Sequence, residues 1–224
     1  MEKISILWDL DGTIIDSVDL YYEAYRPVFN KYYPGTFTTF KEEYRTRYFG
    51  QGVEVFLRDH IDGPISEEQM AAMKWDYLIA ANEHLMSSPD GGIRLLPGVD
   101  RIINAFFEKG YPMAIASTSW MPTVVHSLEK VGLLEKFANI SSGFLLPSKP
   151  APDVFLLAAS LNRMPPERCV VFEDSLAGMK GAKAAGMKCV GIATSVDVAQ
   201  MVDADIAVSS YTDLPIEQIE ALFS

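Results

Sequence analysis

The sequence has few of the side chains that hold transition metals or form disulfide frameworks, with three histidines and two cysteines among 224 residues. His60, His84 and His126 are scattered and match no metal-binding spacing, so we expect ordinary structural roles for them. Cys169 and Cys189 each begin an apolar, strand-like run, which predicts two buried free thiols rather than a disulfide. Free thiols are typical of the reducing cytoplasm, where we expect this protein to reside.

Positive charge is also scarce: 19 Lys and Arg residues stand against 30 Asp and Glu residues, and the formal net charge is −11. Phosphate backbones and anionic membranes select basic surfaces, so this balance argues against nucleic-acid and membrane partners. No apolar run approaches membrane-spanning length, and Asp9 interrupts the first one, so we expect no signal peptide. The hydrophobic share of 49% is enough for a full core, and we expect a monomer.

What the sequence does contain is an alternation of apolar runs and helical segments. Strand-like runs occupy 4–8, 111–117, 137–141, 168–172, 188–193 and 205–209. Helical stretches lie near 98–109, 121–131, 152–162, 175–185 and 215–223. Strands that alternate with helices over short connections form a parallel sheet. The sequence therefore predicts an α/β fold with a Rossmann-like core.

Residues 17–88 depart from this alternation because they contain no convincing strand. Their pattern predicts helices near 17–32, 38–48, 51–61 and 66–86. Glycines and prolines on either side mark the ends of the stretch. We therefore expect a core made of 1–15 and 96–224, with an all-helical cap inserted as 16–95. The tyrosines expected to build the core of that insertion are Tyr21, Tyr22, Tyr25, Tyr32, Tyr33, Tyr44, Tyr48 and Tyr77.

The first strand-like run leads into Asp9-Leu-Asp11-Gly12-Thr13. Residues i and i+2 of a strand point to the same side, so the two carboxylates should emerge together. Neighbouring carboxylates repel each other unless they share a cation or a proton. The pair suits Mg²⁺ and phosphate chemistry, with one aspartate as nucleophile and the other as proton carrier. The alternative is an Asp-rich turn without a catalytic role.

Two later loops add groups that suit a phosphate. The hydroxyl of Ser117, beside the N–H groups that begin the next helix, can hold phosphate oxygens; a turn or helix-cap role is the alternative. Lys149 can supply a cation for a phosphoryl oxygen and offset clustered carboxylates; a solvated surface charge is the alternative. Because the carboxyl ends of parallel strands meet at one edge of a sheet, both loops should converge with Asp9.

A second acidic pair, Glu173-Asp174, follows the apolar run at 168–172. Ser175 is placed to cap the next helix, whose small residues allow close packing against the sheet. An acidic pair held rigidly at a strand end favours metal binding. Oxygen ligands alone favour Mg²⁺ over zinc.

In this order, the Asp-x-Asp-Gly-Thr, Ser-Thr, Lys-Pro and Glu-Asp-Ser motifs resemble the haloacid dehalogenase superfamily. The match is closest to its β-phosphoglucomutase-like and phosphoglycolate-phosphatase-like branch. The resemblance covers essentially the whole chain, including a helical cap after the first strand. It implies a Mg²⁺-dependent phosphatase that hydrolyses a small phosphorylated metabolite through an aspartyl-phosphate. The dehalogenase branch is disfavoured because it lacks the second aspartate, Asp11.

The resemblance also implies a role for each motif residue. Asp9 would attack phosphorus, while Asp11 would protonate the leaving group and then activate water. The implied Mg²⁺ ligands are Asp9, the backbone carbonyl of Asp11, and Asp174, with Glu173 close by or ligating. The groups implied to cradle the phosphoryl oxygens are Ser117, the backbone at Thr118, and Lys149.

Other folds that bind phosphate or metals fit less well. An EF-hand loop needs Gly and Glu at the positions of Ile14 and Leu20, and the Walker A and Gly-x-Ser-x-Gly motifs are absent. A phospho-accepting signalling switch of the response-regulator type also clusters Asp, Ser or Thr, and Lys on a parallel sheet. That class is a shorter single domain whose phosphorylated Asp is not on the first strand, and it has no large helical insertion.

A phosphosugar mutase of the same superfamily is the closer alternative. The mutases resemble one another in carrying a histidine shortly after the first motif and a lysine after the second. Tyr21 and Trp120 stand at these positions here, which favours hydrolysis over transfer back to a sugar. Candidate cap residues for substrate choice are Arg47, Gln51 and Lys74, and the phosphorylated metabolite itself stays open.

Overall fold

The structure, a computed structural model, describes residues 3–50 and 52–224. The chain divides into two compact units. Met1–Asp16 and Leu95–Ser224 together form the core unit, and Ser17–Arg94 forms the helical unit. The helical unit is one continuous stretch and is therefore an insertion into the core unit.

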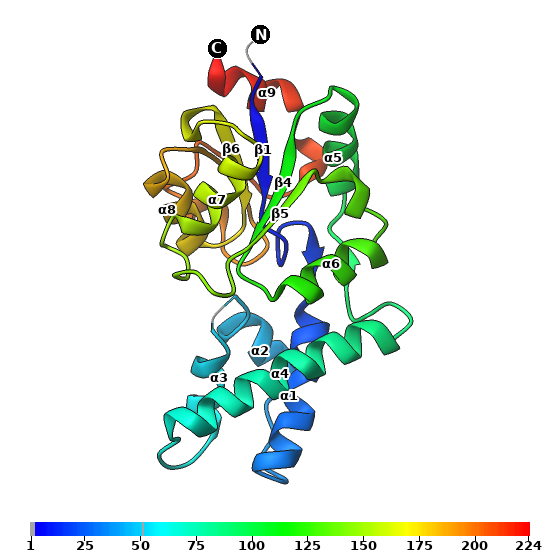
Figure 1. The fold of residues 1–224 in the computed structure, drawn as a ribbon, viewed down its shortest axis with the longest axis vertical. Coiled ribbons are helices and arrows are strands. Elements are labelled where there is room, and N and C mark those ends of the chain that lie inside the picture. The colour runs from blue at the N-terminus through cyan, green and yellow to red at the C-terminus, as the bar shows by residue number, and fades with distance from the viewer. Residues whose placement is uncertain (1–2, 51) are drawn as a thin grey trace. The chain divides into compact units, whose positions relative to one another are not determined.

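A six-stranded parallel sheet forms the centre of the core unit (Figure 1). Its strands are β1 (Ser5–Trp8), β4 (Met113–Ser117), β5 (Asn139–Ser142), β6 (Cys169–Glu173), β7 (Lys188–Ile192) and β8 (Ile206–Val208). The spatial order is β5-β4-β1-β6-β7-β8. Trp8 of β1 pairs with Ile115 of β4 and with Phe172 of β6, so the ends of these three strands lie side by side. The predicted α/β fold is confirmed.

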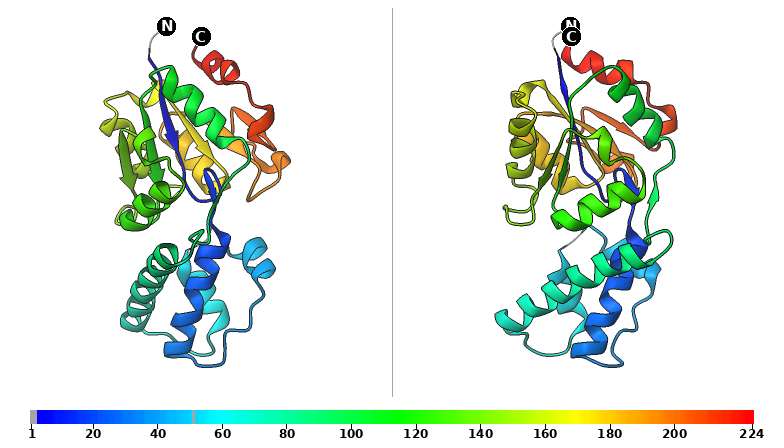
Figure 2. Two further views of the ribbon diagram at one scale, coloured as in Figure 1. Left: turned by 90° about the vertical axis from the view of Figure 1, so that its right-hand side faces the viewer. Right: turned by 45° about the vertical axis from the view of Figure 1, so that its right-hand side comes forward.

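Helices cover both faces of this sheet. They are α5 (Val99–Glu108), α6 (Met121–Lys130), α7 (Asp153–Leu161), α8 (Leu176–Ala184) and α9 (Ile216–Glu220). In Figure 2, α7 and α8 lie on one face, and α5 and α9 lie together on the other. Burial from both sides explains why β1, β4 and β6 are fully buried and read as continuous apolar runs. The intervening 3₁₀ helices are Leu134–Lys136, Pro166–Arg168, Val198–Gln200, Tyr211–Asp213 and Ala221–Phe223.

Trp8 and Phe172 anchor the two strands that carry the acidic motifs. Their rings stack with centroids 4.0 Å apart and an interplanar angle of 9°, and both side chains are fully buried. Such a pair contributes about 0.5–1.5 kcal/mol beyond its buried area. Because each ring directly precedes an acidic residue, Asp9 or Glu173, the backbone that carries these carboxylates is held firmly.

The helical unit contains α1 (Val18–Tyr32), α2 (Lys41–Arg47), α3 (Val53–His60) and α4 (Glu67–Ser87). The α1 and α4 helices pack against each other (Figure 1). The ring of Tyr25 lies 4.1 Å from that of Phe56 and 4.4 Å from that of Tyr77, between centroids. The predicted tyrosine core is confirmed for the buried members, which are Tyr22, Tyr25, Tyr44, Tyr48 and Tyr77. The half-buried members are Tyr21, Tyr32 and Tyr33.

The insertion is not entirely helical at its ends. Two short strands, β2 (Ile15–Asp16) and β3 (Arg94–Leu95), form a two-stranded sheet of their own. The expected all-helical stretch of 16–95 therefore begins and ends in extended backbone. A two-residue strand has too few positions for an alternating pattern, so nothing in the sequence marked it.

Two further expectations concern the whole chain. Cys169 and Cys189 are buried free thiols, as predicted. Within the described residues, none of the helices combines the length and the apolar character needed to cross a membrane.

Candidate active site

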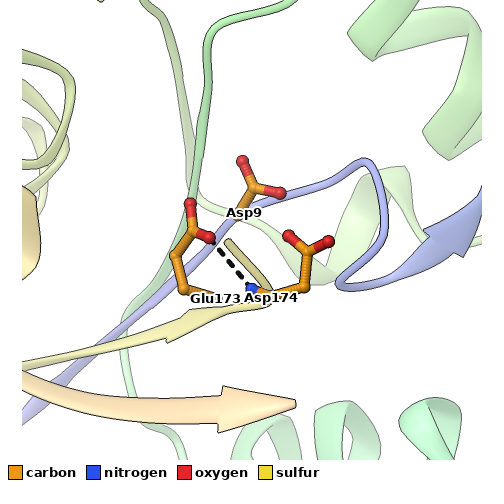
Figure 3. Close-up of side chains that lie close together, drawn as sticks. All are labelled: Asp9, Glu173 and Asp174. Atoms are coloured by element: carbon orange, nitrogen blue, oxygen red, sulfur yellow. Dashed lines mark hydrogen bonds between the residues drawn. The ribbon is translucent and has the colours of Figure 1, made fainter. Parts of the chain in front are cut away.

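Three buried carboxylates approach one another where the central strands end: Asp9, Glu173 and Asp174 (Figure 3). One oxygen of each lies within 4.8 Å of the others. The Asp9 N–H donates a 3.0 Å hydrogen bond to the carbonyl of Phe172, which ties the end of β1 to β6. Over 3–50 and 52–224, this is the one group of three His, Cys, Asp or Glu residues placed to hold a metal ion.

Lys149 joins this cluster from the loop between β5 and α7. Its ammonium lies 2.5 Å from Asp9 Oδ1 and donates a second hydrogen bond to Glu173 Oε1. Only 9% of the side chain is exposed, so the alternative of a solvated surface charge is wrong. Burial alone would lower the pKa of Lys149, but the carboxylates of Asp9 and Glu173 raise it above its usual value. The two carboxylates therefore favour the charged form of the lysine.

The cluster carries more negative than positive charge, with three carboxylates against one ammonium. Burial raises the pKa of Asp9 well above its ordinary range, and Lys149 offsets only part of that effect. Burial and the neighbouring Glu173 raise the pKa of Asp174 to about 7. The protein alone therefore cannot keep all three groups ionised at low cost. An oxygen-ligated divalent cation would balance this donor set.

Asp174 is held by hydroxyl groups rather than by a cation of the chain. Thr13 Oγ1 donates a 3.3 Å hydrogen bond to its Oδ1, and Ser195 Oγ donates one to its Oδ2. Gly12, with φ of +81°, lies so close that a Cβ atom there would be 2.1 Å from Asp174 Oδ2. The turn after Asp11 therefore needs a residue without a side chain, both for its backbone angle and for the space.

Glu173 uses both carboxylate oxygens within the protein. Oε1 accepts a hydrogen bond from Lys149, and Oε2 accepts one from the N–H of Asp174 at 2.9 Å and one from that of Ser175 at 2.8 Å. Ser175 caps α8 as predicted, since its hydroxyl accepts a 3.0 Å hydrogen bond from the Gly178 N–H. Within the three-carboxylate group, Glu173 therefore has Lys149 as its direct partner, and its ligation of a metal stays a prediction.

Asp11 is not part of the three-carboxylate group. β1 ends at Trp8, so strand alternation does not extend to Asp11. Its Oδ2 instead accepts a 2.6 Å hydrogen bond from the hydroxyl of Ser119, which follows β4. The Ser119 carbonyl accepts a 2.8 Å hydrogen bond from Ser142 Oγ, which fixes the loop. The implied metal contact of Asp11 concerns its backbone carbonyl and stays a prediction.

Ser117 and Thr118, the expected phosphate-binding residues, begin the loop after β4. The buried Ser117 hydroxyl accepts a 3.1 Å hydrogen bond from the Ser119 N–H, which is a turn contact, and Thr118 is exposed. Their roles toward phosphate stay predictions. The sequence interpretation assigned no role to Ser119, although it belongs to the same Ser-Thr-Ser motif. Thr194 and Ser195 were also missed, because no sequence motif marks the loop after β7.

The candidate residues for substrate choice lie in the helical unit. Arg47 lies 3.2 Å from Asp59, and Lys74 lies 2.6 Å from Glu54, as ion pairs within that unit. Gln51 lies outside the described residues. Their roles in specificity stay predictions.

The comparison with known families agrees with this arrangement. The model of the haloacid dehalogenase-like hydrolases matches residues 6–192. The chain belongs to this family. The match includes both acidic motifs and Lys149, and it ends directly after β7, before Thr194 and Ser195.

Named relatives include phosphatases and a mutase. The chain is 27% identical over 210 residues to hexitol phosphatase A of Escherichia coli, covering 94% of this chain and 92% of the relative. It is 26% identical over 217 residues to β-phosphoglucomutase of Bacillus subtilis, covering 95% and 92%. The chloroplastic protein SUPPRESSOR OF QUENCHING 1 of Arabidopsis thaliana is 32% identical over 212 residues, but this chain spans only 19% of its length.

A solved structure shares the fold over nearly its full length. The crystal structure of CbbY from Rhodobacter sphaeroides in complex with phosphate has a TM-score of 0.79 and 27% identity, and the match covers 95% of this chain and 96% of that one. The haloacid dehalogenase-like family and its named phosphatases support phosphoric monoester hydrolase activity for this chain.

Proposed function

We propose that this protein is a Mg²⁺-dependent phosphatase that hydrolyses a small phosphorylated metabolite through an aspartyl-phosphate on Asp9. The observation that carries the proposal is the buried group of Asp9, Glu173 and Asp174 with the Lys149 ammonium in contact with two of its members. A carboxylate nucleophile, a cation for the transferred group and a place for a divalent metal are the parts that phosphoryl transfer requires.

The excess negative charge of the cluster fits Mg²⁺ held by Asp9, Asp174 and the backbone carbonyl of Asp11. The bound cation would neutralise charge on the phosphoryl oxygens and lower the repulsion between that group and Asp9. Glu173 positions Lys149, whose ammonium stabilises the charge that develops on the transferred group.

Asp9 and Asp11 carry out the two steps of the reaction, formation and hydrolysis of the aspartyl-phosphate. A carboxylate oxygen of Asp9 forms a bond to phosphorus as the ester P–O bond breaks, and Asp11 gives its proton to the departing oxygen. In the second step Asp11, now ionised, takes a proton from water as the water oxygen attacks phosphorus and the bond to Asp9 breaks. Inorganic phosphate leaves, and both aspartates return to their starting states. Ser119 holds Asp11 in one orientation for both transfers.

We infer that the helical unit sets substrate choice as a cap. The side chains assigned to the chemistry all come from the core unit. Such a division lets one reaction serve different phosphate esters.

The test is phosphate release from a panel of phosphorylated metabolites with Mg²⁺. Asp9→Asn removes the nucleophile's charge with little change of volume, so it should abolish turnover while circular dichroism and thermal unfolding stay close to wild type. Asp100→Asn, at an exposed position of α5, is the matched control and should keep full activity. Acid-quenched mass spectrometry should find the phosphoryl group on the peptide that contains Asp9. Near-normal turnover by Asp9→Asn, or full activity in excess chelator, would refute the proposal.

The phosphosugar mutase is the second candidate, favoured by the relation to β-phosphoglucomutase. Tyr21 and Trp120 argue against it, because they stand where the mutases carry histidine and lysine. Incubation with β-glucose 1-phosphate, Mg²⁺ and a bisphosphate activator should give no glucose 6-phosphate above background. Efficient isomerisation would establish the mutase instead.

A further inference from the structure

Hydroxyl groups of the segment after β7 donate hydrogen bonds to Asp174 and to the turn beside it. Ser195 Oγ donates a hydrogen bond to Asp174 Oδ2, and Thr194 Oγ1 donates one to the backbone carbonyl of Gly12. Farther on, Tyr211 Oη donates a 2.9 Å hydrogen bond to the carbonyl of Thr13. These three residues lie beyond the part of the chain that the family model matches, which ends at residue 192.

The contact at Asp174 has a particular chemical character. Asp174 is only 4% exposed, and the side-chain donors to its carboxylate in the described chain are neutral hydroxyls, those of Thr13 at 3.3 Å, Thr194 at 3.5 Å and Ser195. A hydroxyl orients a carboxylate without cancelling its charge, whereas Lys149 does cancel charge at Asp9 and Glu173. The hydroxyls therefore fix the orientation of the Asp174 carboxylate, and its negative charge stays available to a cation.

The same segment also fixes the turn that lies against Asp174. A Cβ atom on Gly12 would lie 2.1 Å from Asp174 Oδ2, so the turn backbone and this carboxylate are in direct contact. The carbonyls of Gly12 and Thr13 are both bound by side chains of the C-terminal segment. Tyr211 is fully buried and contacts both the turn, through Thr13, and Trp8, whose ring centroid lies 6.2 Å from its own. The C-terminal segment therefore holds both the Gly12–Thr13 turn and the Asp174 carboxylate by hydrogen bonds.

We propose that Ser195 is a positioning residue for metal binding: its hydroxyl holds the Asp174 carboxylate in the orientation that a divalent cation needs. The inference rests on the proposed function, because it takes Asp174 as a metal ligand. Groups that orient a metal ligand typically change metal affinity about 10- to 100-fold when removed. Ser195 is exposed, so its replacement should act on affinity rather than on folding.

Metal affinity can be measured apart from activity by titrating the metal-free protein with Mn²⁺, an oxygen-preferring cation, and following free Mn²⁺ by electron paramagnetic resonance. Ser195→Ala should weaken Mn²⁺ binding by at least about 10-fold. Ser195→Thr keeps the hydroxyl and should restore binding close to wild type. Ser209→Ala, an exposed hydroxyl of the same C-terminal segment, is the matched control and should bind like wild type. The melting temperature of metal-free Ser195→Ala should equal that of the wild type.

The outcomes separate the inference from the proposed function. If Asp174→Asn abolishes Mn²⁺ binding but Ser195→Ala binds like wild type, the inference is wrong and the proposed function stands. A metal-free Ser195→Ala protein that melts several degrees lower also overturns the inference, since the hydroxyl would then serve the fold. If the wild type shows no Mn²⁺ binding that depends on Asp174, the metal assignment falls and the inference falls with it.

Discussion

The ammonium of Lys149 lies 2.5 Å from Asp9 Oδ1, although 140 residues separate the two in the sequence. It donates a second hydrogen bond to Glu173, so one cation serves two carboxylates from neighbouring strands. This contact links the loop after β5 to the ends of β1 and β6, and under the proposed function the lysine serves both the stability and the chemistry of the site.

Lys149→Met should separate these two contributions. Removing one charged donor from a phosphoryl-transfer site should lower kcat about 10²–10³-fold. The metal-free variant, measured above neutral pH, should also lose about 3–5 kcal/mol of stability, because two buried carboxylates are left without a counter-charge. Adding Glu173→Gln should recover part of the stability, measured by urea unfolding, and none of the activity. Activity of Lys149→Met within a few-fold of wild type would exclude the lysine from the chemistry.

The sequence predicted the places of the acidic motifs well because they depend on local pattern. β1 ends just before Asp9 and β6 ends at Glu173, as the apolar runs indicated. The contact of Lys149 with the carboxylates was also expected, because loops at the carboxyl ends of parallel strands meet at one edge of the sheet. Which carboxylates it pairs with depends on the tertiary packing of three loops, which no local pattern reports. The hydrogen bond from Ser119 to Asp11 was missed, because a two-residue alternation was extended past the end of the strand.

Gly12→Ala should damage the metal site more than the fold. The new Cβ would lie 2.1 Å from Asp174 Oδ2 and push this carboxylate away, so Mn²⁺ affinity and kcat/KM should both fall by more than about 10-fold. Gly186→Ala is the matched control, since its φ of +78° carries a similar backbone cost and nothing lies within 4 Å of the added Cβ. Both variants should lose about 1–2 kcal/mol of stability from the left-handed backbone. Equal metal affinities in the two variants would contradict the assignment of Asp174 as a ligand.

The raised pKa of Asp174 predicts how the metal-free protein responds to pH. Its carboxyl titrates near 4 in the unfolded chain and at about 7 in the folded one, so the folded state holds its proton over this range. Stability from this group is complete below about pH 4 and is lost as the pH rises to about 7. Between about pH 4 and about pH 7, the melting temperature of the wild type should fall relative to that of Asp174→Asn, and above about pH 7 the difference between the two proteins should stay constant. Saturating Mg²⁺ should remove the fall in the wild type. If the two plots of melting temperature against pH run parallel throughout, Asp174 is already ionised and the prediction is wrong.

The rate loss caused by replacing Asp11 or Ser119 should depend on the leaving group of the substrate. If Asp11 protonates the departing oxygen, its loss matters most for esters whose leaving group is a strong base. Asp11→Asn should therefore slow the phosphorylation step far more with an alkyl phosphate than with p-nitrophenyl phosphate, in single-turnover experiments. Ser119→Ala, which removes this hydrogen bond to Asp11, should show the same trend at smaller amplitude. Equal losses on both substrates would give Asp11 a metal-binding or structural role instead.

Substrate choice should follow the helical unit. The residues assigned to chemistry lie in the core unit, so a chimera that replaces Ser17–Arg94 with the matching segment of hexitol phosphatase A should keep its dependence on Asp9 and Mg²⁺. Its ranking of substrates by kcat/KM should move toward that of the E. coli enzyme. Small esters should change least, because they draw little binding energy from groups remote from the phosphate.

If the helical unit moves during turnover, hydrogen exchange at 12–17 and 89–97 should slow when a phosphate-mimicking ligand binds. An unchanged ranking in the chimera, with unchanged exchange at both connections, would make the insertion a structural appendage.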